Sequence, residues 1–582
     1  MEKLRRILWR VVLLSLALLF AGSMSLSMAA QGPDKEKAPA KAKYKAGTYT
    51  TVGNGRGGPI VVQVKFSPTA ITDIKVIAHN ESHMIGDVPI DTFPGLIVKN
   101  QSLAVDTVSG ATISSMALIA AISQAVKDAG GNPAALKKKI PVDKKPAVDA
   151  VADVVVVGGG GAGLTAAIHA ANAGAKVILL EKLDILGGTA SYSIEAAGSA
   201  ATAVHKGIGA TANAKDFYAF LVNYWGPKAD PQILEVFANN SGKAMDWLMS
   251  IGAQLPVTNA AFGVQPSREV GKMGEAIVSA LVREAKHKKI DCRTSSQATK
   301  LVMNNGAVAG VQVKGPSGEY TIKAKAVVLA TGGFAANNEM VAKYYPKLKG
   351  YIYSSSKGAT GDGQLMAEAV GAKLRDMDNM RIGWTYYVKG QRVYYTGAMM
   401  NTGGILVNND GKRYINDQAS YMQGTKVLEQ GGGWMIFDNS IVESVKDVRD
   451  YYDQGFFETA PTIRELAKKI GVNEDNLAAT VERYQGFVKA GKDADFGRPR
   501  LNMAFDEPPF HACKVSLVVQ GTFGGIVTTP DTQVISTAGG AIPGLYAAGE
   551  VAGPGTWGAN PAAANIVFGT IAGQKAAEFA RY

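Results

Sequence analysis

Cysteine is almost absent from this sequence, and its absence excludes several classes of redox and metal protein. The 582 residues include only two cysteines, Cys292 and Cys513, and neither has another cysteine near it in the chain. A CxxCH haem site, a zinc site of paired cysteines and a cysteine-ligated iron–sulfur cluster all require more thiolates. A disulfide scaffold is excluded for the same reason. Any redox chemistry of this chain must therefore depend on an organic cofactor.

Long apolar runs are equally scarce. The run at 11–21 is broken only by Ser15, follows a basic stretch at 1–10, and precedes a possible cleavage site after Ala29. It is short for a helix that spans a bilayer. We expect residues 1–30 to be a signal peptide, with an uncleaved anchor as the alternative. The mature protein is then expected to be periplasmic or otherwise exported, without stable membrane insertion.

The formal net charge is +12, and much of it lies in two lysine-rich stretches, 34–45 and 137–145. Such runs are usually solvated linkers. Neither is accompanied by a zinc finger, an aromatic RNA-binding signature or a basic recognition helix. We therefore expect no nucleic acid among the partners of this protein.

Residues 46–131 are predicted to form a small α+β domain with an anion-binding turn. The motif Asp106-x-x-Ser109-Gly110-Ala111-Thr112 leads into a helix at 114–128. Free backbone N–H groups, the helix dipole and the hydroxyls suit a phosphate, and a plain N-cap with a tight turn is the alternative. Alternation of β-branched residues between turn signals predicts three strands before this motif. These strands are 47–51, 60–66 and 71–78.

Together with His79-x-Glu81, this motif closely resembles that of FMN-binding domains that a flavin transferase modifies. The resemblance implies that FMN is joined to Thr112 through a phosphoester bond, and that a flavin transferase is a partner. His79, Glu81 and His83 have the spacing of metal ligands on one strand face. The flavin-domain pattern already accounts for two of them, so we expect no metal. Residues 132–149, rich in Pro and Lys, are predicted to be a linker.

The chain beyond this linker begins with the pattern of a dinucleotide-binding fold. An apolar strand at 153–157 runs into a GxGxxG turn and a helix at 162–173, and a second strand at 176–180 ends at Glu181. Glycines allow close approach to a pyrophosphate, the helix N-terminus stabilises its charge, and Glu181 accepts hydrogen bonds from ribose hydroxyls. The residues predicted to hold the cofactor here are Gly158, Gly160, Gly161, Ala162, Gly163 and Glu181.

Later markers resemble those of FAD enzymes with a split flavin domain. Gly187-Gly188-Thr189 follows the first acid, Thr331-Gly332-Gly333 closes a later strand, and Gly549-Glu550 ends another. A small-residue helix within 558–573 is predicted to direct its N-terminus toward the flavin, where its dipole would stabilise the reduced, anionic ring. The resemblance implies non-covalent FAD, with further contacts from Lys182, Asn565 and Ile566.

Residues 151–582 are similar to flavoproteins of the fumarate reductase and urocanate reductase family, and the added FMN-binding domain is most similar to the urocanate reductase branch. The resemblance implies an α/β fold, in which a split Rossmann-like FAD-binding domain carries an inserted α+β capping domain. Within the cap we expect a hairpin at 405–414 and helices at 440–450, 462–469 and 474–489. The expected boundaries are 46–131 for the FMN-binding domain, 132–149 for the linker, 150–383 and 512–582 for the FAD-binding domain, and 384–511 for the capping domain.

In that family a reduced flavin passes hydride to the β-carbon of a C=C bond, a neighbouring carbonyl or carboxylate takes up charge, and an acid protonates the α-carbon. Gly411-Lys412-Arg413-Tyr414-Ile415-Asn416-Asp417 matches the family's Gly-Lys-Arg-Phe-x-Asn-Glu segment, which implies that Arg413 is the proton donor. Arginine is a poor acid in water, so this role needs a dry site and a partner that returns the proton. The alternative is that Arg413 pairs with Asp410 or Asp417 on a turn.

The substrate pocket departs from the pattern of a fumarate reductase. Gly397 and Met400 stand where the family has its relay acid and second arginine, and Gly521 and Pro561 stand where it has a carboxylate-binding His and Arg. A dicarboxylate would leave charges unpaired in a dry pocket, so fumarate is not the expected substrate. Arg381 is a candidate carboxylate clamp. The other residues expected at the substrate are Asp378, Trp384, Tyr394 and Tyr395.

The sequence therefore predicts an exported, FAD- and FMN-dependent ene-reductase that acts on a urocanate- or cinnamate-like enoate as a terminal step of anaerobic respiration. The expected electron donor is a quinol-linked or periplasmic cytochrome. Two alternatives stay open: a ketone desaturase of the ketosteroid dehydrogenase type, and a two-flavin electron carrier without a substrate of its own.

Overall fold

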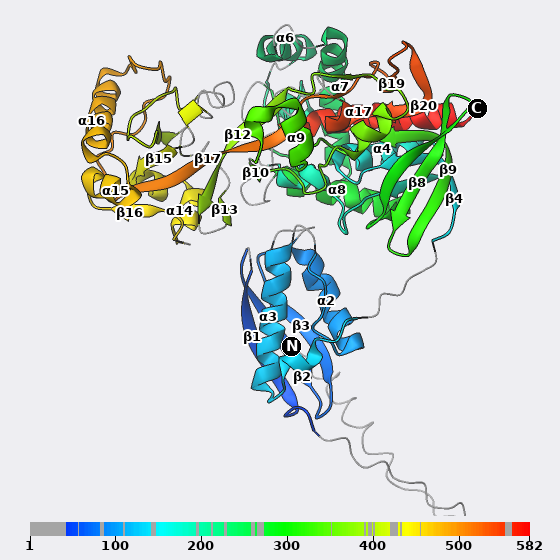
Figure 1. Ribbon diagram of the computed structural model, residues 1–582, viewed down its shortest axis with the longest axis horizontal. Coiled ribbons are helices and arrows are strands. Elements are labelled where there is room, and N and C mark those ends of the chain that lie inside the picture. Colours follow the sequence, from blue (N-terminus) through cyan, green and yellow to red (C-terminus); the bar gives the residue numbers. More distant parts are fainter. Residues whose placement is uncertain are drawn as a thin grey trace, which may run out of the picture.

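The computed structural model shows a small N-terminal domain, a large central body and a cap beside it (Figure 1). None of the helices in the described part of the chain has the length and hydropathy needed to cross a membrane. The structure describes residues 42–55, 57–81, 86–108, 111–140, 147–193, 197–210, 213–225, 230–257, 262–264, 273–350, 352–388, 391–393, 399, 402–418, 429–430, 433–453, 455–552 and 561–582.

The small domain is an antiparallel sheet covered on one face by two helices. Its strands are β1 (Gly47–Gly55), β2 (Gly58–Phe66) and β3 (Ile71–Ala78), and its helices are α2 (Asp87–Asn100) and α3 (Thr112–Asp128). Alternate residues of β2 are buried beneath the helices, as the period of a strand requires. Gly53 lets α3 pack closely on β1, because a Cβ there would collide with the backbone of Ala117. A short 3-10 helix, η1 (Pro133–Leu136), follows.

The central body is built on an eight-stranded sheet whose parallel strands come from distant parts of the chain. C-terminal β20 (Ala541–Ala547) pairs with β9 (Gly318–Leu329), and β9 pairs with β4 (Ala150–Val157), so the flavin fold is split as predicted. The remaining strands of this sheet are β5 (Val177–Leu180), β6 (Asp291–Arg293), β7 (Gln297–Asn304), β8 (Ala307–Gly315) and β19 (Gln533–Ile535).

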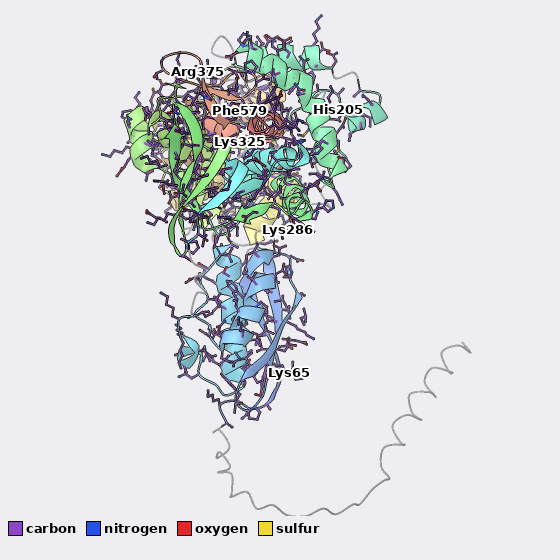
Figure 2. The ribbon with its side chains drawn as sticks, turned by 90° about the vertical axis from the view of Figure 1, so that its right-hand side faces the viewer. Lys65, His205, Lys286, Lys325, Arg375 and Phe579 are labelled. Atoms are coloured by element: carbon purple, nitrogen blue, oxygen red, sulfur yellow. The ribbon has the colours of Figure 1, made fainter. Side chains whose placement is uncertain are left out.

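The two faces of this sheet are covered differently. Val154 and Val156 point into a core formed with helices, whereas Val155 and Val157 point into a core shared with β7 and β8. The helical layer contains α4 (Gly161–Asn172), α6 (Ala214–Trp225), α7 (Pro231–Ser250), α8 (Met273–His287) and α17 (Pro561–Ala580). Lys286, in the last turn of α8, lies on the side of the body that faces the small domain (Figure 2).

Shorter elements connect these layers. The glycines of α17 allow it to lie directly on α4, because a Cβ at Gly569 or Gly573 would collide with the backbone of Ala162 or Ala166. The other elements of the body are η2 (Gly188–Tyr192), α5 (Ala203–Gly207), α9 (Asn338–Tyr344), η4 (Pro346–Leu348), α10 (Asp362–Glu368), β11 (Leu374–Arg375), β18 (Gly525–Ile526) and η6 (Gly549–Ala552).

The cap contains a seven-stranded sheet with its own core. Its central strand is β17 (Phe510–Thr522), which is antiparallel to β12 (Met380–Val388) and to β15 (Gly433–Asp438). The paired strands β12 and β17 run from the cap into the central body (Figure 1). The other strands are β10 (Ile352–Tyr353), β13 (Gln391–Val393), β14 (Ile405–Val407) and β16 (Glu458–Ala460), and the helices are α13 (Asn439–Ser444), α14 (Lys446–Asp453), α15 (Ile463–Ile470) and α16 (Glu474–Ala490).

Of the hairpin expected at 405–414 the structure keeps the turn, which an isolated antiparallel bridge between Val407 and Arg413 closes, whereas β14 pairs along its length with β15. The helix expected at 440–450 is divided at Val445, whose backbone is extended. The predicted fold class is confirmed: a split, Rossmann-like α/β body with an α+β cap, preceded by a small α+β domain.

Candidate flavin and substrate site

The glycine-rich turn between β4 and α4 forms one wall of the candidate site. A Cβ on Gly158 or on Gly163 would collide with neighbouring backbone, and Gly158 has a φ of +109°, so both positions require glycine. Gly160 differs, because a Cβ there would meet only a carbonyl oxygen at 3.9 Å. No side chain caps α4, so the N–H groups of its first turn remain available to an anion beside this open space.

Glu181 closes this turn from the end of β5. One of its carboxylate oxygens accepts a hydrogen bond of 2.8 Å from the Gly159 N–H, and the other accepts one of 2.8 Å from the Leu183 N–H. Burial raises the pKa of Glu181, although these two hydrogen bonds lower it. The Lys182 backbone also bonds to this carboxylate, and its remaining acceptor capacity suits the predicted ribose contact. Lys182 is engaged elsewhere, because its ammonium is held by Asp362, at 3.0 Å, and by Thr360.

Two further turns border the same space. Gly187 donates a hydrogen bond of 2.8 Å to the Gly159 carbonyl and forms a parallel bridge with Gly160. Thr189 accepts one of 3.2 Å from the Ser356 N–H. In the second turn, Gly332 has a φ of +74° and its carbonyl accepts a bond from Gln364.

Buried oxygens along these turns lack partners in the described part of the chain. They belong to Ser191, Thr331, Ser355 and Gln364. Buried polar atoms without partners are rare in folded proteins. The open space at Gly160, the free helix N-terminus and these oxygens together fit a ligand that is rich in hydrogen-bonding groups and carries a pyrophosphate. The residues present therefore fit FAD.

Glu550 lies where the flavin fold meets β17. Its carboxylate accepts hydrogen bonds from the Thr522 N–H at 2.8 Å and from the Thr522 hydroxyl at 3.3 Å. The same hydroxyl accepts a bond of 3.2 Å from Phe334. Burial raises the pKa of Glu550 to about 7. The hydrogen bonds from Thr522 and Gly333 and the charge of Arg381 lower this pKa, but they do not outweigh burial. Glu550 therefore fastens β17 to the turn that contains Gly333.

Arg381 lies beside this junction. The register of β12 on β17 pairs Arg381 with Gly521, and the preceding residue with Thr522. Its side chain is half-buried, and its charge acts on the pKa of Glu550. Arg381 thus places a cation where the cap meets the flavin fold. Asp378, in the turn before β12, is exposed.

The C-terminal helix contributes Asn565. A Cβ on Gly549 would lie 2.9 Å from the Asn565 amide oxygen, and a Cβ on Gly161 would lie 3.7 Å from the same side chain. The Asn565 side chain therefore lies close to two of the predicted cofactor turns. Ile566 is buried in the helical core, and only its backbone could serve a ligand. α17 begins at Pro561, and residues 553–560 before it lie outside the described residues.

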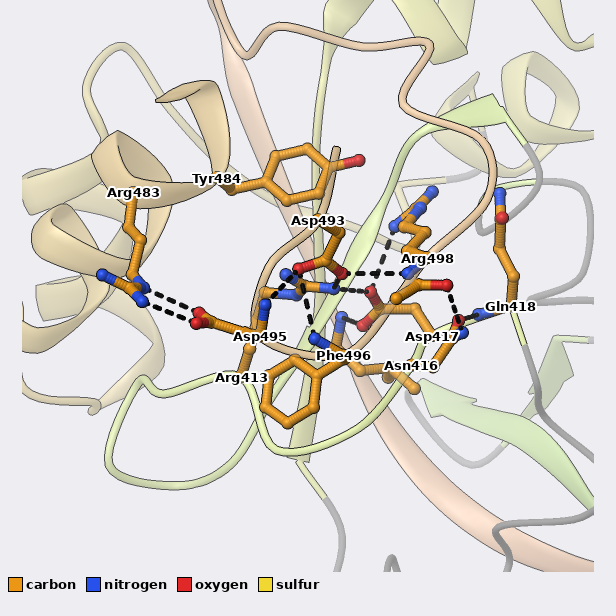
Figure 3. Close-up of polar contacts among 12 residues, drawn as sticks. Arg413, Asn416, Asp417, Gln418, Arg483, Tyr484, Asp493, Asp495, Phe496 and Arg498 are labelled. Atoms are coloured by element: carbon orange, nitrogen blue, oxygen red, sulfur yellow. Dashed lines mark hydrogen bonds and ion pairs between the residues drawn. The ribbon is translucent and has the colours of Figure 1, made fainter. Parts of the chain in front are cut away.

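Arg413 lies in the interior of the cap (Figure 3). Its side chain is 4% exposed, and one terminal nitrogen donates to Asp417 at 2.8 Å and to Asp493 at 2.9 Å. The guanidinium also lies over the rings of Tyr484 and Phe496. Both carboxylates raise the pKa of Arg413, although burial lowers it, which makes the arginine a weaker acid.

These contacts include one of the two carboxylates weighed from the sequence, Asp417, and one that was not foreseen, Asp493. The Nε and Nη1 atoms of Arg413 are buried without a partner in the described part of the chain. The role of Arg413 as proton donor stays a prediction. The ion pair with Asp417 is one that the alternative expected, and the ion pair with Asp493 joins Arg413 to a second segment of the cap.

The predicted FMN end of the small domain is organised by Glu81. This buried carboxylate accepts a hydrogen bond from the Ser114 hydroxyl and one of 2.8 Å from the Gly57 N–H. It thereby joins the β1–β2 turn to the first turn of α3, whose first residue is Thr112. His79 is exposed and accepts a hydrogen bond of 3.3 Å from the Glu81 N–H.

Some predicted residues cannot be compared with these contacts. Tyr394, Tyr395, Gly397 and Met400 lie outside the described residues, and so do the side chains of Thr112 and Trp384. Among the residues that the structure describes, His, Cys, Asp and Glu side chains form no group suited to a metal ion.

Comparison with known proteins decides the family. Residues 153–567 match the FAD binding domain family, and residues 55–127 match the FMN-binding domain family. The chain belongs to the FAD-binding oxidoreductases that include fumarate and urocanate reductases. This flavoprotein is 35% identical to the urocanate reductase of Eggerthella lenta over 566 residues, which cover 92% of this chain and 93% of the relative.

A second relative matches a shorter stretch of the flavoprotein. The fumarate reductase (cytochrome) of Shewanella frigidimarina is 37% identical over 444 residues, which cover 74% of this chain and 77% of the relative. The open conformation of a flavocytochrome c3 fumarate reductase matches this structure with a TM-score of 0.68 and 33% identity, covering 77% of this chain and 83% of that one.

Sequence patterns missed several residues that shape the flavoprotein's site. Ser355 and Gln364 belong to no motif, and only their position beside the glycine turns shows that they border the cofactor space. Thr522 directly follows Gly521 in the sequence, but only the fold shows its bonds to Glu550 and Phe334.

Proposed function

We propose that this flavoprotein uses FAD and FMN to reduce the C=C bond of an α,β-unsaturated carboxylate, with a urocanate- or cinnamate-like substrate rather than fumarate. The observation that carries the proposal is Arg381, a half-buried cation at the junction of the cap and the flavin fold. A guanidinium binds one carboxylate well, through two parallel hydrogen bonds. The printed activities of the two relatives, reduction of urocanate and of fumarate, support C=C reduction.

The chain's own residues have separate tasks in this proposal. FAD, held by the glycine turns, Glu181 and Asn565, would supply hydride when reduced. Arg381 binds and orients the substrate carboxylate, and Glu550 keeps β17 fixed against the Gly333 turn, so that substrate and flavin hold one geometry. Neither Gly521 nor Pro561 offers a charge to a second carboxylate, which disfavours fumarate.

The second flavin and the cellular setting belong to the same proposal. FMN is attached to Thr112 by a flavin transferase, as the Ser109-Gly110-Ala111-Thr112 motif supports. The basic and apolar N-terminus supports export to the periplasm. Electrons then come from a quinol-linked or periplasmic cytochrome, and enoate reduction serves as a terminal step of anaerobic respiration.

The test is an anaerobic assay with reduced methyl viologen, in which urocanate, cinnamates, acrylate and fumarate are compared. We expect dye oxidation with a bulky enoate and little with fumarate. Arg381→Ala should raise KM for that enoate about 100-fold, because one charge-assisted pair is lost in a partly dry site. Arg375→Ala, a nearby arginine on β11, is the matched control and should leave KM unchanged.

Two outcomes would decide against this function. Oxidation of a 3-ketosteroid with a dye acceptor, without turnover of any enoate, would favour the ketone desaturase. Reduction of both flavins without turnover of any compound would favour an electron carrier. Brisk fumarate reduction would show that the interpretation of Gly521 and Pro561 is wrong.

A further inference from the structure

Ile185 links the flavin fold to the small domain. It lies in the turn 182–188 after β5, and its side chain packs against the hydrophobic core of the small domain. Its neighbours stay with the flavin fold, since Leu186 packs on the helical core and Gly187 bonds to Gly159. Two residues of chain span at most about 7 Å. The small domain therefore contacts the flavin fold directly beside the turn that borders the FAD space.

The end of the small domain that faces the central body is the end with the flavin motif. α3 begins there with Thr112, and this end points toward the central body (Figure 1). Ile113 and Met116, in the first turns of α3, are 45% and 61% exposed. Extensive packing between helices and strands stays within each body among the described elements. A small apolar contact of this kind suits two domains that dock and separate.

The body side of this contact carries charges of both signs, because the acidic Asp184 directly precedes Ile185 in the turn and basic residues lie at the end of α8. α2 starts with Asp87 at the end of the small domain that faces the body, and Asp91 follows in the next turn. On the central body, α8 ends with basic residues that include Lys286, which lies on the side facing the small domain (Figure 2). Opposite charges steer an encounter and speed it, and salt weakens that effect.

The linker allows separation only over a limited distance. Its first part is held to the small domain, because the Ser102 hydroxyl donates to the carbonyls of Leu136 and Lys138. Its last part is held to the central body, because Asp149 accepts a bond of 2.8 Å from the Thr321 N–H. The chain between Lys138 and Asp149 spans about 40 Å at most. A short tether of this length keeps the two surfaces at an effective concentration in the millimolar range.

We propose that the turn 182–188 is the docking surface for the flavin-bearing end of this chain's own small domain, with Ile185 as its apolar contact and Lys286 as a steering charge. This inference rests on the proposed FMN at Thr112. Docking there brings the reduced flavin of the small domain beside the FAD turn. When both flavins are bound, each reduced FMN would give up two electrons and each FAD would take up two, while the accompanying protons would exchange with water.

The experiment compares the wild-type holoprotein with Ile185→Asp, with Ile208→Asp as the matched control. Ile208 is 65% exposed on the same body and lies outside this turn. Photoexcited 5-deazariboflavin, with EDTA as donor, reduces the accessible flavin, and absorbance then follows transfer to FAD. We expect Ile185→Asp to slow this first-order phase at least tenfold and Ile208→Asp to leave it unchanged. Small-angle X-ray scattering should show a larger maximum dimension for Ile185→Asp alone.

Ile185→Ala and Lys286→Glu are measured as well, so that the result does not depend on whether Ile185→Asp keeps its FAD. Ile185→Ala should slow the phase about threefold without adding a charge, and Lys286→Glu should remove its dependence on salt. Wild-type rates and dimensions in Ile185→Asp, with both flavins bound, would overturn the docking surface. If the wild type shows no first-order transfer phase and behaves like Thr112→Ala, then electrons do not pass from FMN to FAD. That result would reject the proposed electron route, and the docking surface together with it.

Discussion

Arg413 donates a hydrogen bond of 2.9 Å to Asp493, a residue 80 positions later in the chain. Asp417 accepts a second bond from Arg413 and also pairs with Arg498, at 3.1 Å, so that two arginines and two aspartates form one buried network (Figure 3). The network joins the segment after β14 to the segment after α16. Removing one member of a buried ion pair leaves its partner uncompensated.

Arg413→Ala should therefore lower the free energy of unfolding by about 3–5 kcal/mol, as measured by urea denaturation. Asp493→Ala should have a similar effect. The control is Arg483→Ala, because Arg483 pairs with Asp495 nearby but is 63% exposed, and such surface pairs contribute at most about 1 kcal/mol. If Arg413→Ala kept its stability and lost two to four orders of magnitude in turnover, as removal of a general acid costs, Arg413 would be the proton donor.

The contrast between β4 and the Arg413 network shows how far sequence alone could lead. The run at 153–157, the GxGxxG turn and Glu181 are close in the chain, so their period and spacing predicted strand, turn and helix. Asp493 and Thr522 owe their roles to partners that are distant in the chain, and a residue type alone does not reveal such a partner. The β14–β15 pairing was missed for the same reason, because the local turn after Val407 favoured a hairpin.

Thr112→Ala should lose FMN and keep FAD. The wild-type chain, produced with a flavin transferase, should retain one flavin after denaturation, and mass spectrometry should place the added FMN at Thr112. In Thr112→Ala only the FAD released by denaturation should remain. Ser123→Ala, three turns further along α3, is the control and should keep both flavins, because its hydroxyl donates to the Ile119 carbonyl of the same helix. Loss of both flavins from Thr112→Ala would contradict the assignment of separate sites.

Glu550→Gln should remove a pH dependence of stability. The pKa of Glu550 is raised from its ordinary 4.5 to about 7 in the folded chain, so the folded state binds more protons between these values. Stability contributed by this group is present below pH 4.5 and is lost as pH rises through 7, by about 3 kcal/mol. Urea denaturation across pH 5–8 should show a steeper loss for the wild type than for Glu550→Gln. Parallel curves would show that Glu550 does not titrate there.

Gly333→Ala should abolish FAD binding with little effect on the small domain. A Cβ at this position would collide with the Thr522 hydroxyl and the Glu550 carboxylate, which would push β17 away from the turn. Flavin fluorescence after denaturation measures the bound FAD. Gly486→Ala is the control, because a Cβ on this helical glycine meets no neighbouring atom within 4 Å, so FAD content should not change. Full FAD content in Gly333→Ala would show that this turn can move without loss of the site.

Strand β17, 13 residues long, is common to the cap and the flavin fold. It pairs with β15 and β16 in the cap, and it ends at Thr522, whose backbone is bonded to Glu550. Heat that melts one of these bodies breaks the strand that supports the other, so both should melt as one cooperative unit. The small domain has a core of its own and should melt independently. Calorimetry should thus show one endotherm for the cap and the central body together, and a separate one for the small domain.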